Sequence, residues 1–181
     1  GNYIGTDATG TPPLPNTGLA GIHINNSGCP IEQPKNVIGG SEPGAGNLIS
    51  GHWKPGSQGW WDDGFGINSF SPNGVIVQGN RIGTDCTGRK PLPNGSGVYV
   101  GHYPGVGYGS TIGGVTPGAG NLVSANEHNG VHVWGSDHVV QGNMIGTDAD
   151  GGMALGNGEC GVVAELTEDC LIGGVEPGAR N

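Results

Sequence analysis

Three aspartates recur at the same point of a repeated motif, and their carboxylates are candidate ligands for a metal ion. Asp7, Asp85 and Asp148 each close a Gly-Thr-Asp triplet, and each precedes a glycine by three residues. Calcium prefers carboxylate oxygens, but it needs six to eight ligands around one point. The repeat described below separates successive aspartates by two coils, about 9.6 Å. We therefore predict that each aspartate caps backbone N–H groups of a turn, and we expect no metal and no cofactor.

The cysteines could serve as metal ligands or as disulfide partners. The chain has four, at Cys29, Cys86, Cys160 and Cys170, and none of them forms a C-x-x-C pair. Without that spacing a zinc site is not indicated. The spacing also fixes no disulfide pairing, so one or two disulfides and four buried free thiols both stay open.

The charge balance narrows the class of partner. The chain carries 15 acidic and 6 basic residues, for a formal net charge of −9. Because six scattered cations cannot neutralise a phosphate backbone, we expect no nucleic-acid partner. No apolar run approaches the roughly 18 residues of a membrane-spanning helix, so we expect no membrane span.

The elements that position these residues follow from an internal repeat. Glycine (41 residues) and proline (13 residues) are frequent enough to indicate disorder unless they are periodic. They are periodic, because the segment Gly1–Asp7 returns at 79–85 and at 142–148. An Ile-Gly-Gly motif alternates with it, and a P-G-A-x-N segment follows each copy. The asparagines of both motifs should stack at coil corners and satisfy backbone groups there; they are Asn2, Asn47, Asn80, Asn121, Asn143 and Asn181.

Short apolar runs with a period of two lie between the motifs and are typical of strands. Val98-Tyr99-Val100 and Val131-His132-Val133 are examples. Stacked in parallel, such strands bury one face in a common core. We predict one all-β domain over residues 1–181, a right-handed single-stranded parallel β-helix (a solenoid) of about five coils. The coils should start at Gly21, Gly64, Gly97, Gly130 and Gly161. The side chains predicted to point inward are Ile22, Ile24, Phe65, Ile67, Val98, Val100, Val131, Val133, Val162 and Ala164.

The repeat motifs I-G-T-D-x-x-G and I-G-G…P-G-A-G-N-L-I-S extend over essentially the whole chain. In this respect the sequence resembles the right-handed parallel β-helix repeats of bacterial secreted and surface proteins, in the pectate-lyase-like fold group. The resemblance implies an extracellular or cell-surface location. It implies little about activity, because one fold hosts many functions.

The outer face of the first strand of each coil is the predicted binding face. Its outer strip comprises His23, Tyr99, His132, Trp134 and Glu165. Two irregular segments, His52–Asp63 and Gly101–Gly109, should flank this strip, and departures from a repeat tend to mark a binding face. Aromatic rings there suit a sugar polymer, whereas a protein contact and simple packing are the open alternatives. The candidate carbohydrate-binding residues are Trp60, Trp61, Tyr99, Tyr103, His132 and Trp134.

We expect no catalytic residues in this chain. A polysaccharide lyase of this fold group would need a basic residue on the strip, and none of the six cations falls there. A glycoside hydrolase would need two carboxylates about 5–9.5 Å apart. The carboxylates of Asp62, Asp63, Asp137 and Glu165 are the plausible donors, and no spacing pairs them.

Both ends of the chain fall in the middle of a repeat. We therefore expect a segment of a longer chain or of a filament, with adjoining coils or self-association covering each end. The expected function is a non-catalytic structural or adhesive module with a polysaccharide as partner. A lyase or hydrolase acting on the outer strip is the alternative.

Overall fold

The computed structural model describes residues 1–26, 35–56, 64–102 and 107–181. Within these ranges the chain forms fifteen β-strands and no helix. It follows that no helix in the described segments is long and apolar enough to cross a membrane.

The strands form three parallel sheets of five strands each. The first sheet contains β2 (Ala20–Asn25), β5 (Phe65–Phe70), β8 (Val98–Gly101), β11 (Val131–Trp134) and β14 (Val162–Glu165). The second contains β3 (Asn36–Gly39), β6 (Val75–Gln78), β9 (Thr111–Gly113), β12 (Val139–Gln141) and β15 (Leu171–Ile172). The third contains β1 (Tyr3–Ile4), β4 (Leu48–Ile49), β7 (Arg81–Ile82), β10 (Leu122–Val123) and β13 (Met144–Ile145).

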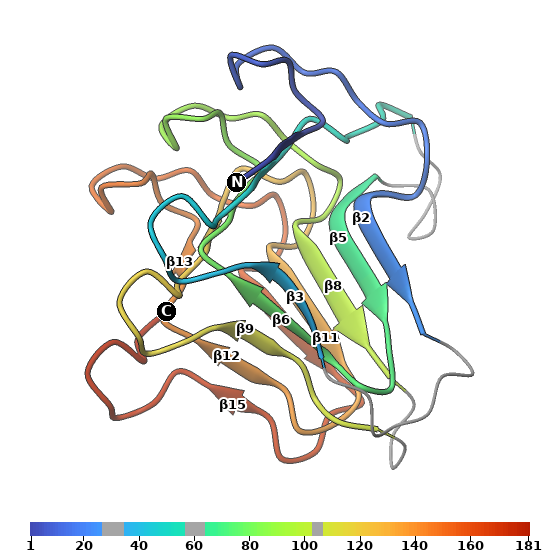
Figure 1. Cartoon of the computed structure of the whole chain (residues 1–181), viewed down its shortest axis with the longest axis vertical. Coiled ribbons are helices and arrows are strands. Elements are labelled where there is room, and N and C mark those ends of the chain that lie inside the picture. Colours follow the sequence, from blue (N-terminus) through green and yellow to red (C-terminus); the bar gives the residue numbers. More distant parts are fainter. Residues whose placement is uncertain (27–34, 57–63, 103–106) are drawn as a thin grey trace.

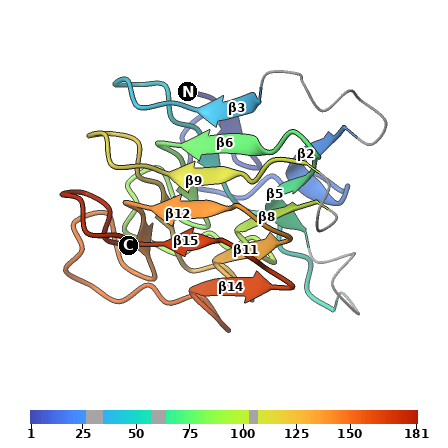
Figure 2. The same ribbon diagram turned by 90° about the horizontal axis from the view of Figure 1, so that it is seen from below.

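From β2 onward, consecutive strands along the chain belong to the first, second and third sheet in turn. The sheets therefore enclose one interior (Figure 1), and the strands of each sheet lie side by side along the stack (Figure 2). The predicted all-β class and the parallel stacking of equivalent strands are confirmed.

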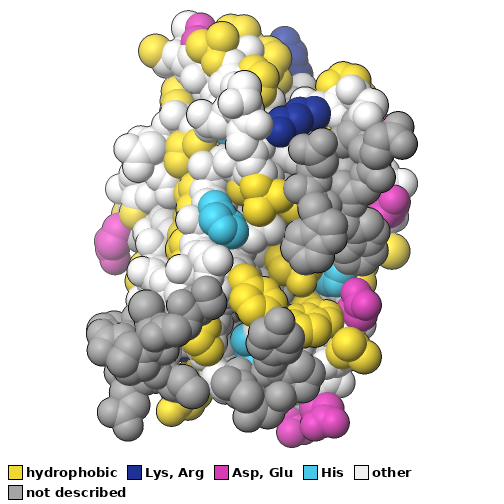
Figure 3. All heavy atoms as spheres, turned by 90° about the vertical axis from the view of Figure 1, so that its right-hand side faces the viewer, with side chains coloured by type: hydrophobic (Ala, Val, Ile, Leu, Met, Phe, Trp, Pro, Cys, Tyr) yellow, Lys and Arg dark blue, Asp and Glu magenta, His cyan; other side chains and the backbone are white. Residues whose placement is uncertain are grey.

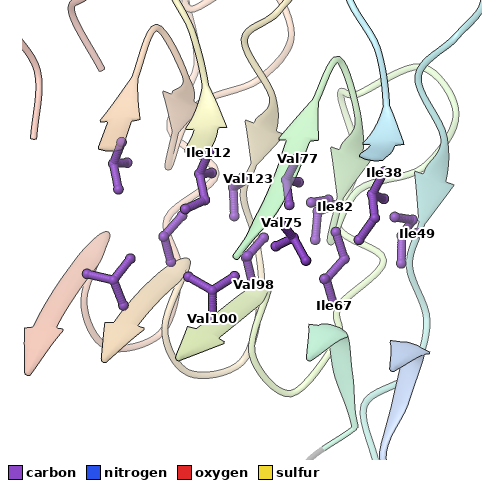
Figure 4. Packing of buried hydrophobic residues seen from close by; sticks show 13 residues of the cluster. Ile38, Ile49, Ile67, Val75, Val77, Ile82, Val98, Val100, Ile112 and Val123 are labelled. Carbon is purple, nitrogen blue, oxygen red and sulfur yellow. The ribbon is translucent and has the colours of Figure 1, made fainter. Parts of the chain in front are cut away.

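The interior is lined by β-branched side chains (Figure 4). Its core cluster consists of thirteen buried residues, all of them isoleucine or valine: Ile38, Ile49, Ile67, Val75, Val77, Ile82, Val98, Val100, Ile112, Val123, Val131, Val133 and Val140. Branched side chains suit this position because each one packs against its equivalent about 4.8 Å away on the next strand. Burying one such side chain contributes about 1.5–3 kcal/mol.

The inward prediction was wrong for Phe65. Its side chain is buried, but it lies outside the core cluster, and its ring centroid is 5.8 Å from that of Tyr99 on the outer face. The cause is an irregularity at Gly66. The N–H groups of Gly66 and Ile67 both donate to the following coil, whereas successive N–H groups of a regular strand point to opposite sides. This shift turns Gly66 inward and Phe65 outward.

The predicted stacking of corner asparagines is confirmed. Six asparagines form a continuous ladder, in which each backbone N–H and each side-chain Nδ2 donate to the Oδ1 of the next. The donor–acceptor distances lie between 2.9 and 3.2 Å. Members in the middle of the stack are fully buried, so the ladder satisfies backbone groups that water does not reach.

A second ladder, which the sequence analysis missed, runs along another corner. It consists of Asn16, His52, Asn94, Asn126 and Asn157. His52 accepts a bond from Asn16 through Nε2 and donates one from Nδ1 to Asn94 Oδ1, at 2.9 and 3.0 Å. The prediction that His52 opens an irregular segment was therefore wrong, because its neutral ring takes the place of an amide. The recurring Leu-Pro-Asn triplets at 14–16 and 92–94 could have indicated this ladder.

The aspartate motifs form turns, as predicted. Asp85 Oδ1 accepts bonds from the Thr87 hydroxyl and from the backbone N–H groups of Arg89 and Lys90. Asp7 and Asp148 likewise accept bonds from backbone N–H groups of their own turns. These turns also stack on one another: Cys86 N–H donates to Gly10 O and Ala149 N–H to Gly88 O, each at 2.9 Å. Together they cover the outer side of the third sheet.

Candidate functional site

The outer face of the first sheet carries two columns of side chains in register across the five strands. One column is His23, Asn68, Tyr99, His132 and Val163; the other is Asn25, Phe70, Gly101, Trp134 and Glu165. Hydrophobic and histidine side chains gather on this side of the molecule (Figure 3).

The strip thus brings together three of the predicted residues, Tyr99, His132 and Trp134, on the neighbouring strands β8 and β11. The other three, Trp60, Trp61 and Tyr103, lie outside the described residues.

Tyr99 lies at the centre of the first column. Its ring meets that of His132 edge-on, with the centroids 5.1 Å apart, and that of Phe65 on its other side. Burial raises the pKa of the Tyr99 hydroxyl, and the negative charge of Glu165 adds to the effect. Tyr99 therefore stays a neutral phenol, with one apolar ring and one polar edge.

His132 and Glu165 form a hydrogen-bonded pair on the strip. His132 Nε2 lies 3.1 Å from Glu165 Oε2, and the histidine is buried while the carboxylate is exposed. Burial lowers the pKa of His132, and its bond to Glu165 offsets part of that shift. The ring is accordingly neutral near pH 7, and Glu165 fixes its orientation.

The rings of Phe70 and Trp134 form a second aromatic group, with Gly101 on the strand between them. We call these three residues the aromatic platform. The three residues are in register on β5, β8 and β11. The ring centroids of Phe70 and Trp134 are 5.8 Å apart and their planes make an angle of 30°. Phe70 and Gly101 were not predicted here, because only the cross-strand register places them beside Trp134.

A pair of buried histidines holds the turn that follows Trp134. His138 Nδ1 accepts a bond from Ser110 N–H, and its Nε2–H donates to the carbonyl of Trp134, at 2.9 and 3.1 Å. Burial lowers the pKa of His138 to about 4. The ring centroid of His102 is 5.1 Å away. His102 was predicted to lie in the irregular segment Gly101–Gly109, whereas the structure buries it at a corner.

Positive charge lies at the margin of this face: Lys54 Nζ donates to the carbonyls of Thr17 and Gly18, just before β2, and Lys or Arg side chains are visible at the upper end of the face (Figure 3). The described cations occupy no strand of the first sheet: Lys35, Lys54, Arg81, Arg89, Lys90 and Arg180 all lie on other elements or in turns. Lys35 donates to Gly109 O and Arg89 pairs with Asp150. An anionic ligand would therefore find Glu165 and no cationic side chain on these strands.

A groove of about 860 Å³ is lined by loops that lie on the side of the molecule opposite the first sheet; the loops can be followed in Figure 1. Its walls are the glycine-rich loops 40–46 and 114–120, and Arg81 and Met144 of the third sheet contribute to its floor. No aromatic side chain is among its described lining residues. We assign the candidate site to the first sheet instead, because the aromatic and titratable side chains converge there.

Within the described ranges, no three His, Cys, Asp or Glu side chains lie close enough to hold a metal ion. Cys86, Cys160 and Cys170 are free thiols, while Cys29 lies outside the described residues.

Comparisons of this chain with protein-family models, with curated protein sequences and with solved structures found no match.

Proposed function

We propose that this chain is a non-catalytic structural or adhesive module of an extracellular or cell-surface protein, and that the outer face of its first sheet binds carbohydrate. In this proposal the chain winds as a right-handed β-helix of about five coils, as in the pectate-lyase-like fold group that its repeats resemble. Parallel, laddered coils support a scaffold role, because stacked repeats present an extended surface.

The observation that carries the binding proposal is the convergence of aromatic rings on the outer face of one sheet. Tyr99, Phe70 and Trp134 are each only partly buried, and they lie on three adjacent strands. Aromatic rings with an apolar face and a polar edge suit the flat apolar faces and hydroxyl edges of sugar rings.

A carbohydrate-active enzyme is the alternative, and the His132–Glu165 pair is the observation that favours it. A lyase or hydrolase acting on the strip would need these groups to transfer protons to the substrate. Their mutual hydrogen bond and the burial of His132 support a positioning role instead. A glycoside hydrolase would also need a second carboxylate at the spacing given above.

The experiment is electrophoretic retention in gels that contain a panel of neutral and acidic polysaccharides, together with assays for newly formed reducing ends and for unsaturated products. We expect retention by at least one polymer and no product. Replacing Trp60 and Trp61 by alanine should weaken that retention without unfolding the protein. If no polymer retains the protein, the binding proposal is wrong. A reaction product that is no longer formed by Glu165→Gln would establish the enzymatic alternative.

A further inference from the structure

The aromatic platform depends on a glycine that separates its two rings. The backbones of β5 and β11 are two strand spacings apart, about 9.6 Å. The ring centroids of Phe70 and Trp134 are only 5.8 Å apart. The two side chains must therefore lean toward each other across β8, and the residue that they lean over is Gly101.

A side chain at position 101 would compete with the indole for this space. A Cβ atom on Gly101 would lie 3.3 Å from Trp134 Cε3 and 3.4 Å from Trp134 Cβ. The 3.3 Å contact, and an equal one with the backbone oxygen of Trp134, are slightly tighter than ordinary van der Waals distances, so the indole and its strand would have to shift by a few tenths of an ångström. Gly101 thus lets the Trp134 ring lie across the sheet beside Phe70.

The charges near the platform restrict the kind of polymer that it can bind. Glu165 is in register with Trp134 on the next strand, and 49% of its side chain is exposed. The chain as a whole carries a formal net charge of −9. An acidic polysaccharide would approach this negative charge, and the strands of the first sheet carry no cation that could offset it. Repulsion between the two negative charges lowers both the affinity and the association rate.

We propose that Phe70, Gly101 and Trp134 form a binding subsite for an uncharged polysaccharide, whose sugar rings stack on the platform. This inference rests on the proposed carbohydrate-binding function and names its ligand class. Stacking on the platform is apolar, so binding should be insensitive to salt, whereas the attraction of an acidic polymer to a cationic site would weaken as salt screens it.

The test compares three variants in retention gels that contain uncharged polymers (a β-glucan, a mannan and a dextran) or acidic ones (polygalacturonate and alginate), at low and high salt. Trp134→Ala removes a ring, and Gly101→Val keeps both rings but displaces the indole. Thr111→Val is the matched control, because it places the same side chain on a partly exposed outer position of the second sheet. Thermal unfolding of each variant verifies that it is folded.

We expect the parent to be retained by at least one uncharged polymer, equally at both salt concentrations. Trp134→Ala and Gly101→Val should each weaken this retention by about tenfold, with Thr111→Val unchanged. Retention by acidic polymers alone, or by an uncharged polymer with both platform variants unaffected, would overturn this inference while leaving carbohydrate binding intact. Retention by no polymer would overturn the proposed function itself.

Discussion

Asparagine suits the coil corners because its side chain imitates a peptide group, with one carbonyl to accept and one amide to donate. His52 does the same in the second ladder through its two ring nitrogens. The first ladder could be predicted because its asparagines recur in every copy of the repeat, and all of them except Asn181 directly follow a glycine. The second could not, since one rung is a histidine and the intervening loops differ in length.

Removing a central rung should be costly. In Asn121→Ala the buried N–H and the side-chain Nδ2 of Asn80 lose the Oδ1 that accepts their bonds, and the carbonyl of Val77 loses the bond from Asn121 Nδ2. At about 1–3 kcal/mol for each unsatisfied group, we expect a loss of about 3 kcal/mol in the free energy of unfolding. Urea unfolding measures this loss. Asn16→Ala is the control at the exposed end of the second ladder and should cost less than about 1 kcal/mol; equal losses in the two variants would contradict the role assigned to burial.

Protonation of the buried histidines gives a second prediction at this scale. The folded-state pKa of His138, about 4, lies below the ordinary value of 6.5. Between these values the unfolded chain takes up a proton that the folded chain excludes. Stability should therefore be complete above about pH 6.5 and fall as the pH drops toward 4, by at most about 3 kcal/mol from His138. The lowered pKa values of His52 and His132 act in the same direction.

The measurement is the urea midpoint as a function of pH, for the parent and for His138→Gln. The variant should show a shallower decline across this window, and an identical slope would rule out His138 as a source. The turn aspartates contribute mainly below this window. Burial opposes the shift at Asp85, but hydrogen bonds from their own turns hold the pKa values of all three aspartates below 3.8, so their contribution is lost mainly as the pH falls below about 4.

At the scale of elements, strand alternation predicts much of the face that each residue occupies. It places Tyr99, His132 and Trp134 on the outer face correctly. It fails for Phe65, because the shift at Gly66 cannot be read from a period of two. It also gives no cross-strand register, and for that reason the pairing of Phe70 with Trp134 over Gly101 emerges only from the structure.

The stacked aspartate turns provide a matched pair of glycines. Gly88 and Gly151 occupy the same turn position, and both have a φ of 71°. A Cβ on Gly88 would lie 2.7 Å from Ala149 Cβ and 2.9 Å from Leu122 Cδ2, whereas one on Gly151 would meet only the end of Met144, at 3.5 Å.

Alanine at either position has the same backbone strain, so the difference between the variants reports the packing of one turn on the next. We expect Gly88→Ala to destabilise the protein by about 1–3 kcal/mol more than Gly151→Ala does, as measured by urea unfolding. Equal effects would show that the turns touch without supporting one another.

At the scale of the whole molecule, each coil contacts mainly its neighbours, so stability should vary along the stack. The side chains of the core column on the second sheet are fully buried at Ile112 and Val140, but Ile172 is 48% exposed. We predict that amide hydrogen exchange is slowest in β5, β6, β8 and β9 and fastest in β14 and β15. Uniform protection across all strands would contradict this gradient.

The same measurement tests the expected self-association. If a second copy packs on the last coil, exchange in β14 and β15 should slow as the protein concentration rises, and the mass by light scattering should rise with it. Exchange rates and mass that are independent of concentration would remove self-association as a property of this chain.

The asparagine ladder has a consequence for the length of the protein. Each asparagine donates to the next one along the chain and accepts from the previous one, so every junction between coils needs the same hydrogen-bond donors and acceptors. A gene segment that encodes one two-coil unit could therefore be duplicated or deleted in frame, and the new junction would reproduce a pairing that already exists. Recombination can therefore change the number of units while every new junction keeps an existing type of contact. The platform residues Phe70, Gly101 and Trp134, in contrast, have to be kept or lost together.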